Sequence, residues 1–558
     1  MPSTVATSYE VILVLRETVD MTPRVHARRW FDAGKVSRLY WHRAEIEMRK
    51  YIAALAVLLV SIAGFLPRSF AQVTEQKLTG SDSAAYDFFG GSVAISGDYA
   101  IVGAAGDDDK GEQSGSAYIF RRNGSSWTQA TKLTASDGLA GDYFGCSAAI
   151  AGDYAIVGAS EAKRNGIRIG LAYIFQRSDS TWNEVAKVAA GDGADLDNFG
   201  ASVAISGDYV IVGAAGDDDK GEQSGSAYIF QRSGGSWTQV AKLTASDGSA
   251  DDFFGGSVAI SGDYVIVGAA GHDDKGEQSG SAYIFQRSGG SWIQAAKLTA
   301  TDGLACDNFG QSVAIFGDLA IVGTVDECDR GVAGSAYIFQ RSGGSWTQVA
   351  KLTASYGSAD DFFGEFVAIS GDYVIVGAAG DDDDGEQSGS AYIFQRSGGS
   401  WTQAAKLTAR DGAAYDFFGE SVAISGDYVI VGAAGDDDKG EQSGSAYVFS
   451  FNLRPPSSPT GPNPPHATAG ICTTPVLSWS DDSRATGYDI YFGTDAAPHS
   501  GKLMANQVSP WFRPGRLANN TTYYWRVEAK NQFGTTTGEV WSFATGNKPC
   551  VRAMPWIE

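Results

Sequence analysis

The chain has 558 residues, which is enough for more than one domain, and it carries a formal net charge of −23. This acidic balance argues against nucleic acid as a partner, because phosphate binding needs clustered lysine or arginine. Only three of the five histidines follow residue 71. Serine- or cysteine-based hydrolysis therefore has few candidate bases, and no spacing supports a zinc site.

The first 71 residues read as material outside the folded protein. Residues 1–47 match nothing that follows, and we expect them to be an untranslated or non-structural extension. Residues 48–71 combine a positive start, an apolar run and small residues just before Gln72, which is the pattern of a secretory signal peptide. The apolar run is short for a membrane-spanning helix. We predict a protein that is secreted or held at the cell surface, with no transmembrane anchor in the mature chain.

A unit of about 55 residues recurs seven times between residues 72 and 452. Each copy opens on a Phe-Gly pair, and the phenylalanines are Phe89, Phe144, Phe199, Phe254, Phe309, Phe363 and Phe418. In the fourth copy, alternating and β-branched residues predict four strands, at 257–261, 264–270, 281–288 and 292–300. A Gly-Asp turn joins the first two. The repeated aromatic residues, such as Tyr228 and Trp237, are expected to pack between neighbouring units.

The two ends of the repeated part indicate how the copies are arranged. The last copy ends after its third strand, at 445–451, and a version of the missing fourth strand stands at 73–79. We expect this N-terminal strand to complete the last unit. Four strands repeated seven times predict a seven-bladed β-propeller over residues 72–452. An array of β-sandwiches is the alternative, but it would need longer linkers with proline between the units.

The C-terminal part has a different composition. Residues 453–466 are rich in proline and predict a semi-rigid linker. Residues 467–546 contain short alternating strands, an early Trp479 and a late strand with Trp525, a pattern that favours a β-sandwich. Residues 547–558 are expected to be a tail. The predicted fold class is therefore all-β, a seven-bladed β-propeller followed by a β-sandwich.

Both domains resemble known families. The Phe-Gly start followed by Ile-Val-Gly-Ala, at 89–90 and 101–104, resembles the FG-GAP repeat, which builds the seven-bladed propeller of integrin alpha subunits and of many bacterial surface proteins. Here the family's Gly-Ala-Pro is Gly-Ala-Ala at 103–105, and only Ser-Gly-Asp at 96–98 stands where integrins carry a calcium loop, so that site is not carried over. Residues 467–546 resemble a fibronectin type III domain, which implies a spacer or a binding unit.

Two loops in each repeat are acidic, and strand alternation predicts that they share one face of the ring. The loop before each Phe-Gly carries one aspartate in all seven copies, namely Asp87, Asp142, Asp197, Asp252, Asp307, Asp361 and Asp416. The Gly-Asp hairpins, from Asp98 to Asp427, are predicted on the opposite face. For both of these sets we favour a structural role, in which the carboxylate bonds turn amides.

The loop after the second strand is the candidate metal site. Clustered carboxylates repel unless a cation neutralises them, and calcium takes six to eight oxygen ligands. The candidate calcium ligands are Asp107, Asp108, Asp109, Asp217, Asp218, Asp219, Asp273, Asp274, Asp381, Asp382, Asp383, Asp436, Asp437 and Asp438. The alternative, that these aspartates bond turn amides and keep the surface soluble, stays open.

The cysteines suggest contacts between loops. Cys306 and Cys328 replace residues of the two acidic loops in one repeat, so we predict a disulfide between them and contact between those loops. Cys472 and Cys550 bracket the second domain and form a second candidate pair. Cys146 is interpreted as a small buried residue.

These features predict a monomeric binding or adhesion protein that meets a protein or glycan ligand on its acidic loop face. The alternatives are a secreted propeller enzyme that acts on polysaccharide and a purely structural matrix component. We do not expect an enzyme. The reactive groups of an enzyme would have to come from the loops of the second and fifth repeats, which depart from the others. The residues of these loops are Glu161, Lys163, Arg164, Asn165, Arg168, Asp326, Glu327, Asp329 and Arg330.

Overall fold

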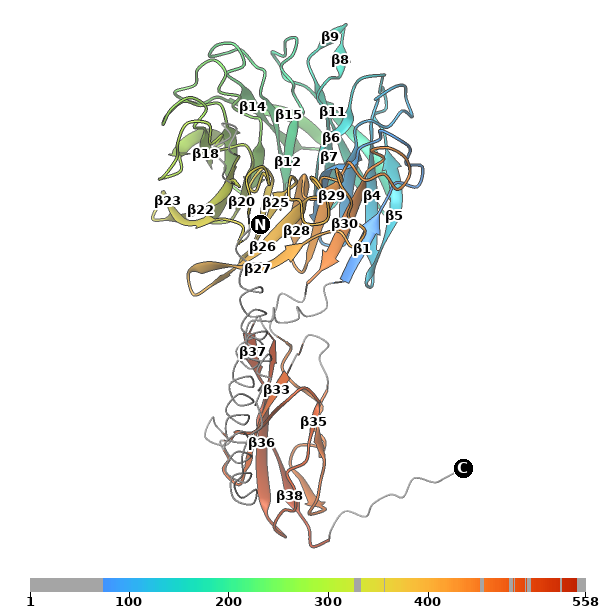
Figure 1. The fold of residues 1–558 in the computed structure, drawn as a ribbon, viewed down its shortest axis with the longest axis vertical. Coiled ribbons are helices and arrows are strands. Elements are labelled where there is room, and N and C mark those ends of the chain that lie inside the picture. The colour runs from blue at the N-terminus through green and yellow to red at the C-terminus, as the bar shows by residue number, and fades with distance from the viewer. Residues whose placement is uncertain are drawn as a thin grey trace, which may run out of the picture. The chain divides into compact units, whose positions relative to one another are not determined.

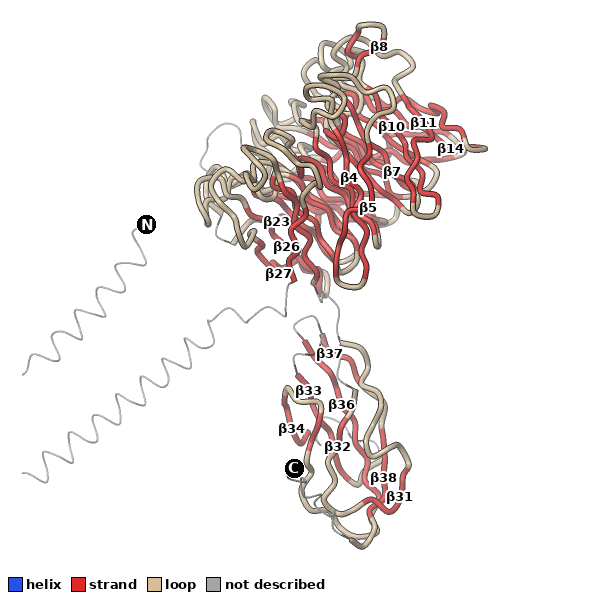
Figure 2. The backbone as a smooth tube through the Cα atoms, turned by 90° about the vertical axis from the view of Figure 1, so that its right-hand side faces the viewer, coloured by secondary structure: helices blue, strands red, loops and turns tan. Residues whose placement is uncertain are grey.

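The computed structural model describes residues 74–325, 333–355, 357–451, 456–480, 485, 487–496, 498, 503–531 and 534–548. The predicted extension 1–47, the signal peptide 48–71 and the tail from 549 onward lie outside these residues, as do Cys328, Cys550 and the residues 326–330. The described residues form strands and loops without a helix (Figure 2). None of them belongs to a helix long and apolar enough to cross a membrane.

Residues 74–451 form seven antiparallel sheets of four strands each, which lie side by side (Figure 1). We number the sheets 1 to 7 in the order of the seven Phe-Gly pairs along the chain. Sheets 1 to 3 contain β2 (Phe89–Ser96), β3 (Tyr99–Ala104), β4 (Ser116–Asn123) and β5 (Ser126–Leu133); β6 (Phe144–Ala151), β7 (Tyr154–Ala159), β10 (Leu171–Ser178) and β11 (Thr181–Val188); β12 (Ser202–Ser206), β13 (Tyr209–Ala214), β14 (Ser226–Ser233) and β15 (Ser236–Leu243).

Sheets 4 to 7 repeat this order. They contain β16 (Val258–Ser261), β17 (Tyr264–Ala269), β18 (Ser281–Ser288) and β19 (Ser291–Leu298); β20 (Val313–Phe316), β21 (Leu319–Thr324), β22 (Ser335–Ser342) and β23 (Ser345–Leu352); β24 (Val367–Ser370), β25 (Tyr373–Ala378), β26 (Ser390–Ser397) and β27 (Ser400–Leu407); β28 (Ser421–Ser425), β29 (Tyr428–Ala433), β30 (Ser445–Ser450) and β1 (Thr74–Leu78). A small hairpin, β8 (Lys163–Arg164) with β9 (Ile167–Arg168), extends from sheet 2.

The predicted strands are confirmed. In the fourth copy β16 to β19 lie within one or two residues of the predicted ranges. The N-terminal strand β1 pairs with β30, with Thr74 opposite Ser450 and Leu78 opposite Ala446. The first and last strands of the repeated part therefore share sheet 7, as the missing fourth strand of the last copy predicts.

Contacts between the first strands run from sheet to sheet and return to the start. β2 contacts β6, and the series continues through β12, β16, β20, β24 and β28, which contacts β2 again. Serine hydroxyls tie neighbouring sheets together. Ser92 Oγ donates to the carbonyl of Gly145 at 2.8 Å, and Ser421 Oγ donates to the carbonyl of Gly90 at 2.5 Å. The second bond joins the last sheet to the first.

The Phe-Gly pair has a steric basis at this junction. Phe89 is fully buried, and its ring meets Tyr118 and Phe120 of the same sheet edge to face, with centroids 5.3 and 6.0 Å apart. Gly90 has a φ of +107°, and a Cβ there would lie 2.2 Å from the carbonyl oxygen of Ser445 in sheet 7. A side chain at this position would therefore push the neighbouring sheets apart.

The tryptophans of the fourth strands pack between sheets, as expected. Trp237 of sheet 3 meets Tyr154 of sheet 2 edge to face at 6.0 Å. Arg232 lies over the same tyrosine ring at 4.4 Å and pairs with Asp208 of its own hairpin. Sheet 5 carries Leu319 in place of the hairpin tyrosine, and Trp401 of sheet 6 packs against that cluster. The sheet contacts thus rest on side chains repeated at the same positions.

The described residues between 456 and 548 form two further sheets. The larger sheet contains β31 (Thr468–Ile471), β38 (Trp541–Thr545), β36 (Thr522–Asn531), β33 (Gly487–Gly493) and β34 (Leu503–Gln507), with β37 (Gly534–Thr537) beside β36. The smaller sheet pairs β32 (Leu477–Ser478) with β35 (Trp511–Phe512). Leu477, Trp479, Tyr488 and Trp525 share one buried cluster.

Candidate functional site

In sheets 1, 3, 4, 6 and 7 the two acidic loops touch one another through a backbone hydrogen bond. Within sheet 1, the Gly106 amide donates to the carbonyl of Asp87 at 3.1 Å. Between sheets 7 and 1, the Tyr86 amide donates to the carbonyl of Glu441 at 2.7 Å. We call the surface that these loops build the loop face. Cys306, which lies in one of these loops, is disulfide-bonded, and so is Cys472. The partners assigned to them, Cys328 and Cys550, lie outside the described residues, so both pairings stay predictions.

A lysine of the fourth strand lies at the centre of each acidic loop cluster. In sheet 3, Lys242 Nζ is 2.9 Å from Asp217 Oδ2, 2.8 Å from Asp192 Oδ2 and 2.6 Å from Asp219 Oδ2. The Tyr228 hydroxyl lies 2.8 Å from Asp217 and 3.0 Å from Asp192. We call this arrangement a lysine cage. The ammonium group occupies the place among the carboxylates that the sequence suggested for a metal ion.

Five sheets share this cage in full or in part. The lysines and their aspartates are Lys132 with Asp82, Asp107 and Asp109; Lys242 with Asp192, Asp217 and Asp219; Lys297 with Asp247 and Asp274; Lys406 with Asp381 and Asp383; and Lys77 with Asp411, Asp436 and Asp438. In sheets 2 and 5 the described residues give the lysine one aspartate each, Lys187 with Asp137 and Lys351 with Asp302.

Two members of the cage in sheet 3 have shifted pKa values. Burial alone would raise the pKa of Asp192, but hydrogen bonds from Lys242 and Tyr228 hold this pKa below its usual value. Burial alone would lower the pKa of Lys242, but its three carboxylate partners outweigh burial and hold this pKa above its usual value. The cage is therefore a set of fixed ion pairs at neutral pH.

The aspartates at the three positions of the candidate loops have different roles. The first ones, Asp107, Asp217, Asp381 and Asp436, are buried, with 3–4% of their surface exposed. Each accepts a hydrogen bond from the backbone amide two residues later, as Asp217 does from Asp219 at 3.1 Å. The second ones are exposed, and each accepts the amide of the glutamine five residues later: Asp108, Asp218, Asp273, Asp382 and Asp437. The third ones pair with the cage lysine.

These contacts agree with the structural alternative, since the carboxylates bond turn amides and a built-in cation. Whether calcium also binds stays a prediction, and it would have to compete with lysine. The loop of sheet 4 differs, because His272 stands where other loops have the first aspartate. Ligand atoms of Asp247, His272 and Asp274 lie within 4.8 Å of one another, as a metal site requires. Lys297 Nζ is nevertheless 2.7 Å from Asp247 and 3.4 Å from His272 Nε2, so a metal would have to displace it.

The other two sets of aspartates are structural, as favoured. Asp87 accepts the backbone amide of Ala84 at 2.7 Å, and its six counterparts make the same bond three residues back. Burial raises the pKa of Asp87 and of Asp416 to about 6. In the hairpins, six of the seven aspartates pair with an arginine of the third strand, as Asp98 does with Arg122.

Sequence reasoning missed the residues that follow each Phe-Gly pair. A cavity of about 340 Å³ is lined by residues in or just before the first strands of all seven sheets, and Cys146, Gln311 and Glu365 lie in its wall. Glu420, at the equivalent position in sheet 7, accepts the backbone amide of Ala434. Burial and the charge of Glu365 raise the pKa of Glu420 to about 8. The available signal was the residue after each Phe-Gly, which varies while its neighbours repeat.

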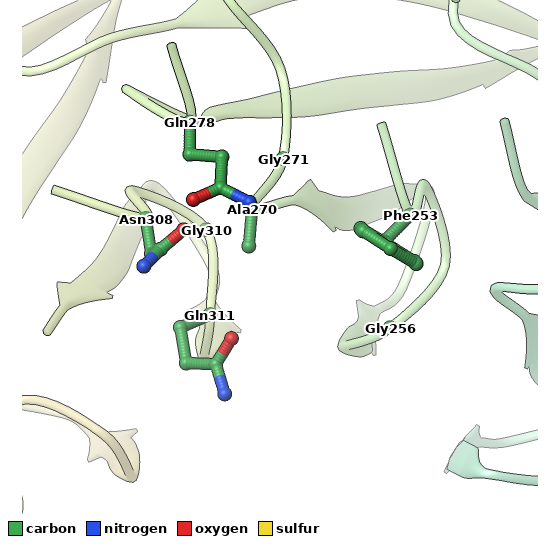
Figure 3. Close-up of a pocket in the computed structure, with 8 residues that line it drawn as sticks. All are labelled: Phe253, Gly256, Ala270, Gly271, Gln278, Asn308, Gly310 and Gln311. Carbon is green, nitrogen blue, oxygen red and sulfur yellow. The ribbon is translucent and has the colours of Figure 1, made fainter. Parts of the chain in front are cut away.

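A second cavity, of about 230 Å³, lies between sheets 4 and 5. Figure 3 shows the carboxamides of Gln278, Asn308 and Gln311 along one side and the ring of Phe253 across from them. Asn308 stands where five other repeats have phenylalanine or tyrosine. It is 4% exposed, and its Nδ2 has no hydrogen-bond partner among the described residues. The exchange of a ring for a smaller amide thus leaves space at this junction.

Comparison with known proteins identifies the repeat. The FG-GAP repeat matches residues 73–120, 127–175, 182–230, 237–285, 292–339, 346–394 and 401–449, which together make up more than half of the chain. The chain belongs to the FG-GAP repeat family. No curated protein matches the chain.

Solved structures match a smaller part of this FG-GAP repeat protein. A mutant of FN3tt is 22% identical, covers 16% of this chain and 96% of its own, and has a TM-score of 0.13. FN3tt is 23% identical over 17% of this chain and 96% of its own, with a TM-score of 0.14. An Fn3-like protein from Clostridium thermocellum is 20% identical over 18% of this chain and 98% of its own, with a TM-score of 0.14.

Proposed function

We propose that this FG-GAP repeat protein is an exported binding or adhesion protein. The seven sheets act as the blades of a seven-bladed β-propeller, and the segment 467–546 acts as a fibronectin type III-like spacer. The observation that carries the proposal is the loop face, where lysine cages hold the loops of several sheets in one charge pattern. A rigid, preformed surface loses little conformational entropy on binding, which favours recognition of a ligand.

The ligand is a protein or glycan presented at a surface, and the propeller is a monomer. Contacts among the first strands pass through all seven sheets and return to the start, which supports a ring with few unpaired strand edges. Calcium at the aspartate loops remains part of the proposal only as a competitor of the cage lysines. Export rests on the signal-peptide pattern at 48–71.

Adhesion of beads coated with the full-length chain to arrayed glycans and immobilised matrix proteins tests this function. The matched variant is Asp108→Asn/Asp218→Asn/Asp437→Asn. It removes three exposed charges and keeps a side-chain oxygen that can accept the hydrogen bond from the backbone amide of each loop glutamine. Specific adhesion that this variant alters supports the loop face as the binding surface. A folded chain that adheres to none of the surfaces would favour the structural matrix component instead.

One observation favours the enzyme as a second candidate. Glu365 lies in the wall of the cavity that all seven sheets line, and Glu420 stands at the equivalent position of the neighbouring sheet. Burial and the charge of Glu365 raise the pKa of Glu420 to about 8. A carboxylic acid that stays protonated beside a carboxylate is the pairing that glycoside hydrolases use. Release of reducing ends from polysaccharide by the wild type, lost in Glu420→Gln, would establish this activity. Equal rates in the two proteins would reject it.

A further inference from the structure

The loop of sheet 2 has the opposite charge from the other loops at the same positions. It has the same length as the loop of sheet 1, and Ala162, Lys163 and Arg164 stand where sheet 1 has Asp107, Asp108 and Asp109. The exchange replaces three carboxylates by a methyl group and two cations. It is therefore a reversal of charge within a loop that keeps its place in the fold.

Backbone hydrogen bonds show that the loop keeps its frame. The Ala162 amide donates to the carbonyl of Ala159 at 3.1 Å, as the Asp107 amide does to Ala104 at 3.3 Å. At the other end, the Gly170 amide donates to the carbonyl of Ala162 at 3.1 Å. Between them β8 and β9 form a hairpin over Asn165-Gly166, whose φ values of 55° and 81° suit a tight two-residue turn. Lys163 and Arg164 are thus held on a defined strand.

The reversal leaves the cage lysine of this sheet without two of its usual partners. Lys187 pairs with Asp137, whereas Lys242 of sheet 3 pairs with three aspartates. A cavity of about 420 Å³ opens beside it, lined among others by Asp137, Lys163, Arg164, Asn165 and Lys187. Three cations face one carboxylate in this lining. Asp142 is buried beneath the loop, but every repeat carries that aspartate, so it does not offset the exchange.

We infer that this cavity binds an anionic group, namely the carboxylate or sulfate of a single acidic sugar residue. Like charges that line one cavity repel, and an anion between them removes the repulsion. The planar guanidinium of Arg164 suits two parallel hydrogen bonds to a carboxylate or sulfate, and the amide of Asn165 can bond a hydroxyl. A volume of about 420 Å³ lies in the range of small-ligand sites and exceeds what a bare ion fills.

The surroundings restrict the ligand further. The loops of sheets 1, 3, 4, 6 and 7 carry exposed aspartates on the same face. A polyanion with charges along its whole length meets repulsion there, whereas one acidic sugar on an otherwise neutral glycan does not. The site thus selects an isolated acidic residue. This inference deepens the proposed function, because it rests on the loop face as the binding surface and names the ligand class.

Binding of methyl β-glucuronide to the full-length chain, measured by saturation-transfer NMR, tests the inference, with methyl β-glucoside as the uncharged control. At about 10 mM, a ligand with a Kd of about 1 mM occupies roughly nine tenths of the sites. We expect saturable binding of the glucuronide, at least tenfold weaker binding of the glucoside, and competition by inorganic sulfate. Heparin should compete less well per charge than sulfate.

The matched variant is Ala162→Asp/Lys163→Asp/Arg164→Asp, which restores the loop of sheet 1 and should complete the cage around Lys187. It should fold and bind the glucuronide at least tenfold more weakly. Lys163→Ser/Arg164→Ser provides the same test should the triple variant fail to fold. Binding of the two glycosides with equal affinity, undetectable binding of the glucuronide, or unchanged binding in the variants overturns the inference. Adhesion of the full-length chain that survives in these variants would leave the proposed function standing without this site.

Discussion

The lysine cages make a sharp prediction about stability, because the sheets provide matched positions with and without a full cage. In sheet 3, Lys242→Met removes the ammonium while keeping most of the apolar stem. It leaves the Asp217 side chain, which is 4% exposed, with hydrogen bonds from the Tyr228 hydroxyl and the Asp219 amide among the described residues. Breaking a buried ion pair by removing one member costs about 3–5 kcal/mol.

The expected loss for Lys242→Met lies at the lower end of that range. The side chains of Asp192 and Asp219 are about half exposed, so water replaces their bonds to Lys242 at little cost, and Asp217 carries most of the effect. We expect a loss of about 3 kcal/mol in the free energy of unfolding. Lys187→Met in sheet 2 is the control. Lys187 and its one partner, Asp137, are both exposed, so the loss should be below about 1 kcal/mol.

Urea unfolding at neutral pH measures both effects. Without Lys242, the buried side chain of Asp217 has lost its cationic partner, and this loss causes the expected deficit. Asp217→Asn/Lys242→Met removes both charges and should recover most of the loss. Equal losses for Lys187→Met and Lys242→Met, or no recovery in the double variant, would refute the cage as a buried ion pair.

Three other predictions concern the same loops and junctions. After removal of metal by a chelator, added calcium should raise the Tm of the Lys242→Met variant more than that of the wild type, because the carboxylates of one cage then lack their lysine. A ligand at 100 times its Kd adds about 2.7 kcal/mol per site. Equal rises in Tm would mean that the lysine does not block the ion. In urea unfolding, Gly90→Ala should destabilise the chain far more than Gly97→Ala, because the Cβ at position 90 would lie 2.2 Å from a carbonyl oxygen. The Cβ at position 97 has nothing within 4 Å, so that substitution costs about 1 kcal/mol of backbone strain. Similar losses for the two variants would contradict the steric account of the Phe-Gly pair. Asp416→Asn should stabilise the chain on the order of 1–3 kcal/mol at pH 8, since the pKa of Asp416 is about 6 in the folded state and about 3.8 as a free side chain. The gain should fall below about 1 kcal/mol near pH 4, where the folded state is protonated and the unfolded state is partly protonated; a gain that stays at its pH 8 value would rule out this cause.

The repeat pattern was sufficient to predict the strands and the exchange that completes sheet 7. Period-two alternation and β-branched runs are local signals, and seven copies of each average out the noise of any one. The missing fourth strand of the last copy and the extra one at 73–79 are visible by counting. The structural role of the aspartates in the Gly-Asp hairpins and in the loops before Phe-Gly could also be predicted, because turn chemistry is local.

The partners of the triple aspartates could not be found in this way. Lys242 pairs with Asp217, which lies 25 residues earlier, and with Asp192, which lies 50 residues earlier, so the cage joins a loop, a strand and the preceding linker. Acidic residues in a row indicate charge, but the cation that neutralises them is set by which strand returns beside the loop. The carboxyl pair near the cavity that all seven sheets line could not be predicted for the same reason. Glu365 and Glu420 stand 55 residues apart and come together only because neighbouring sheets share a junction.

Local information in the chain therefore settles the strand pattern and the number of sheets, whereas the steric reason for each Phe-Gly lies in a contact with the neighbouring sheet. The charge balance of the loop face depends instead on long-range contacts, because electrostatic partners are chosen by distance in space and burial rather than by sequence spacing. At Lys242 folding supplies an internal counter-ion for three aspartates. At Lys187 the same fold with Ala162-Lys163-Arg164 in the loop leaves positive charge without a partner of that kind.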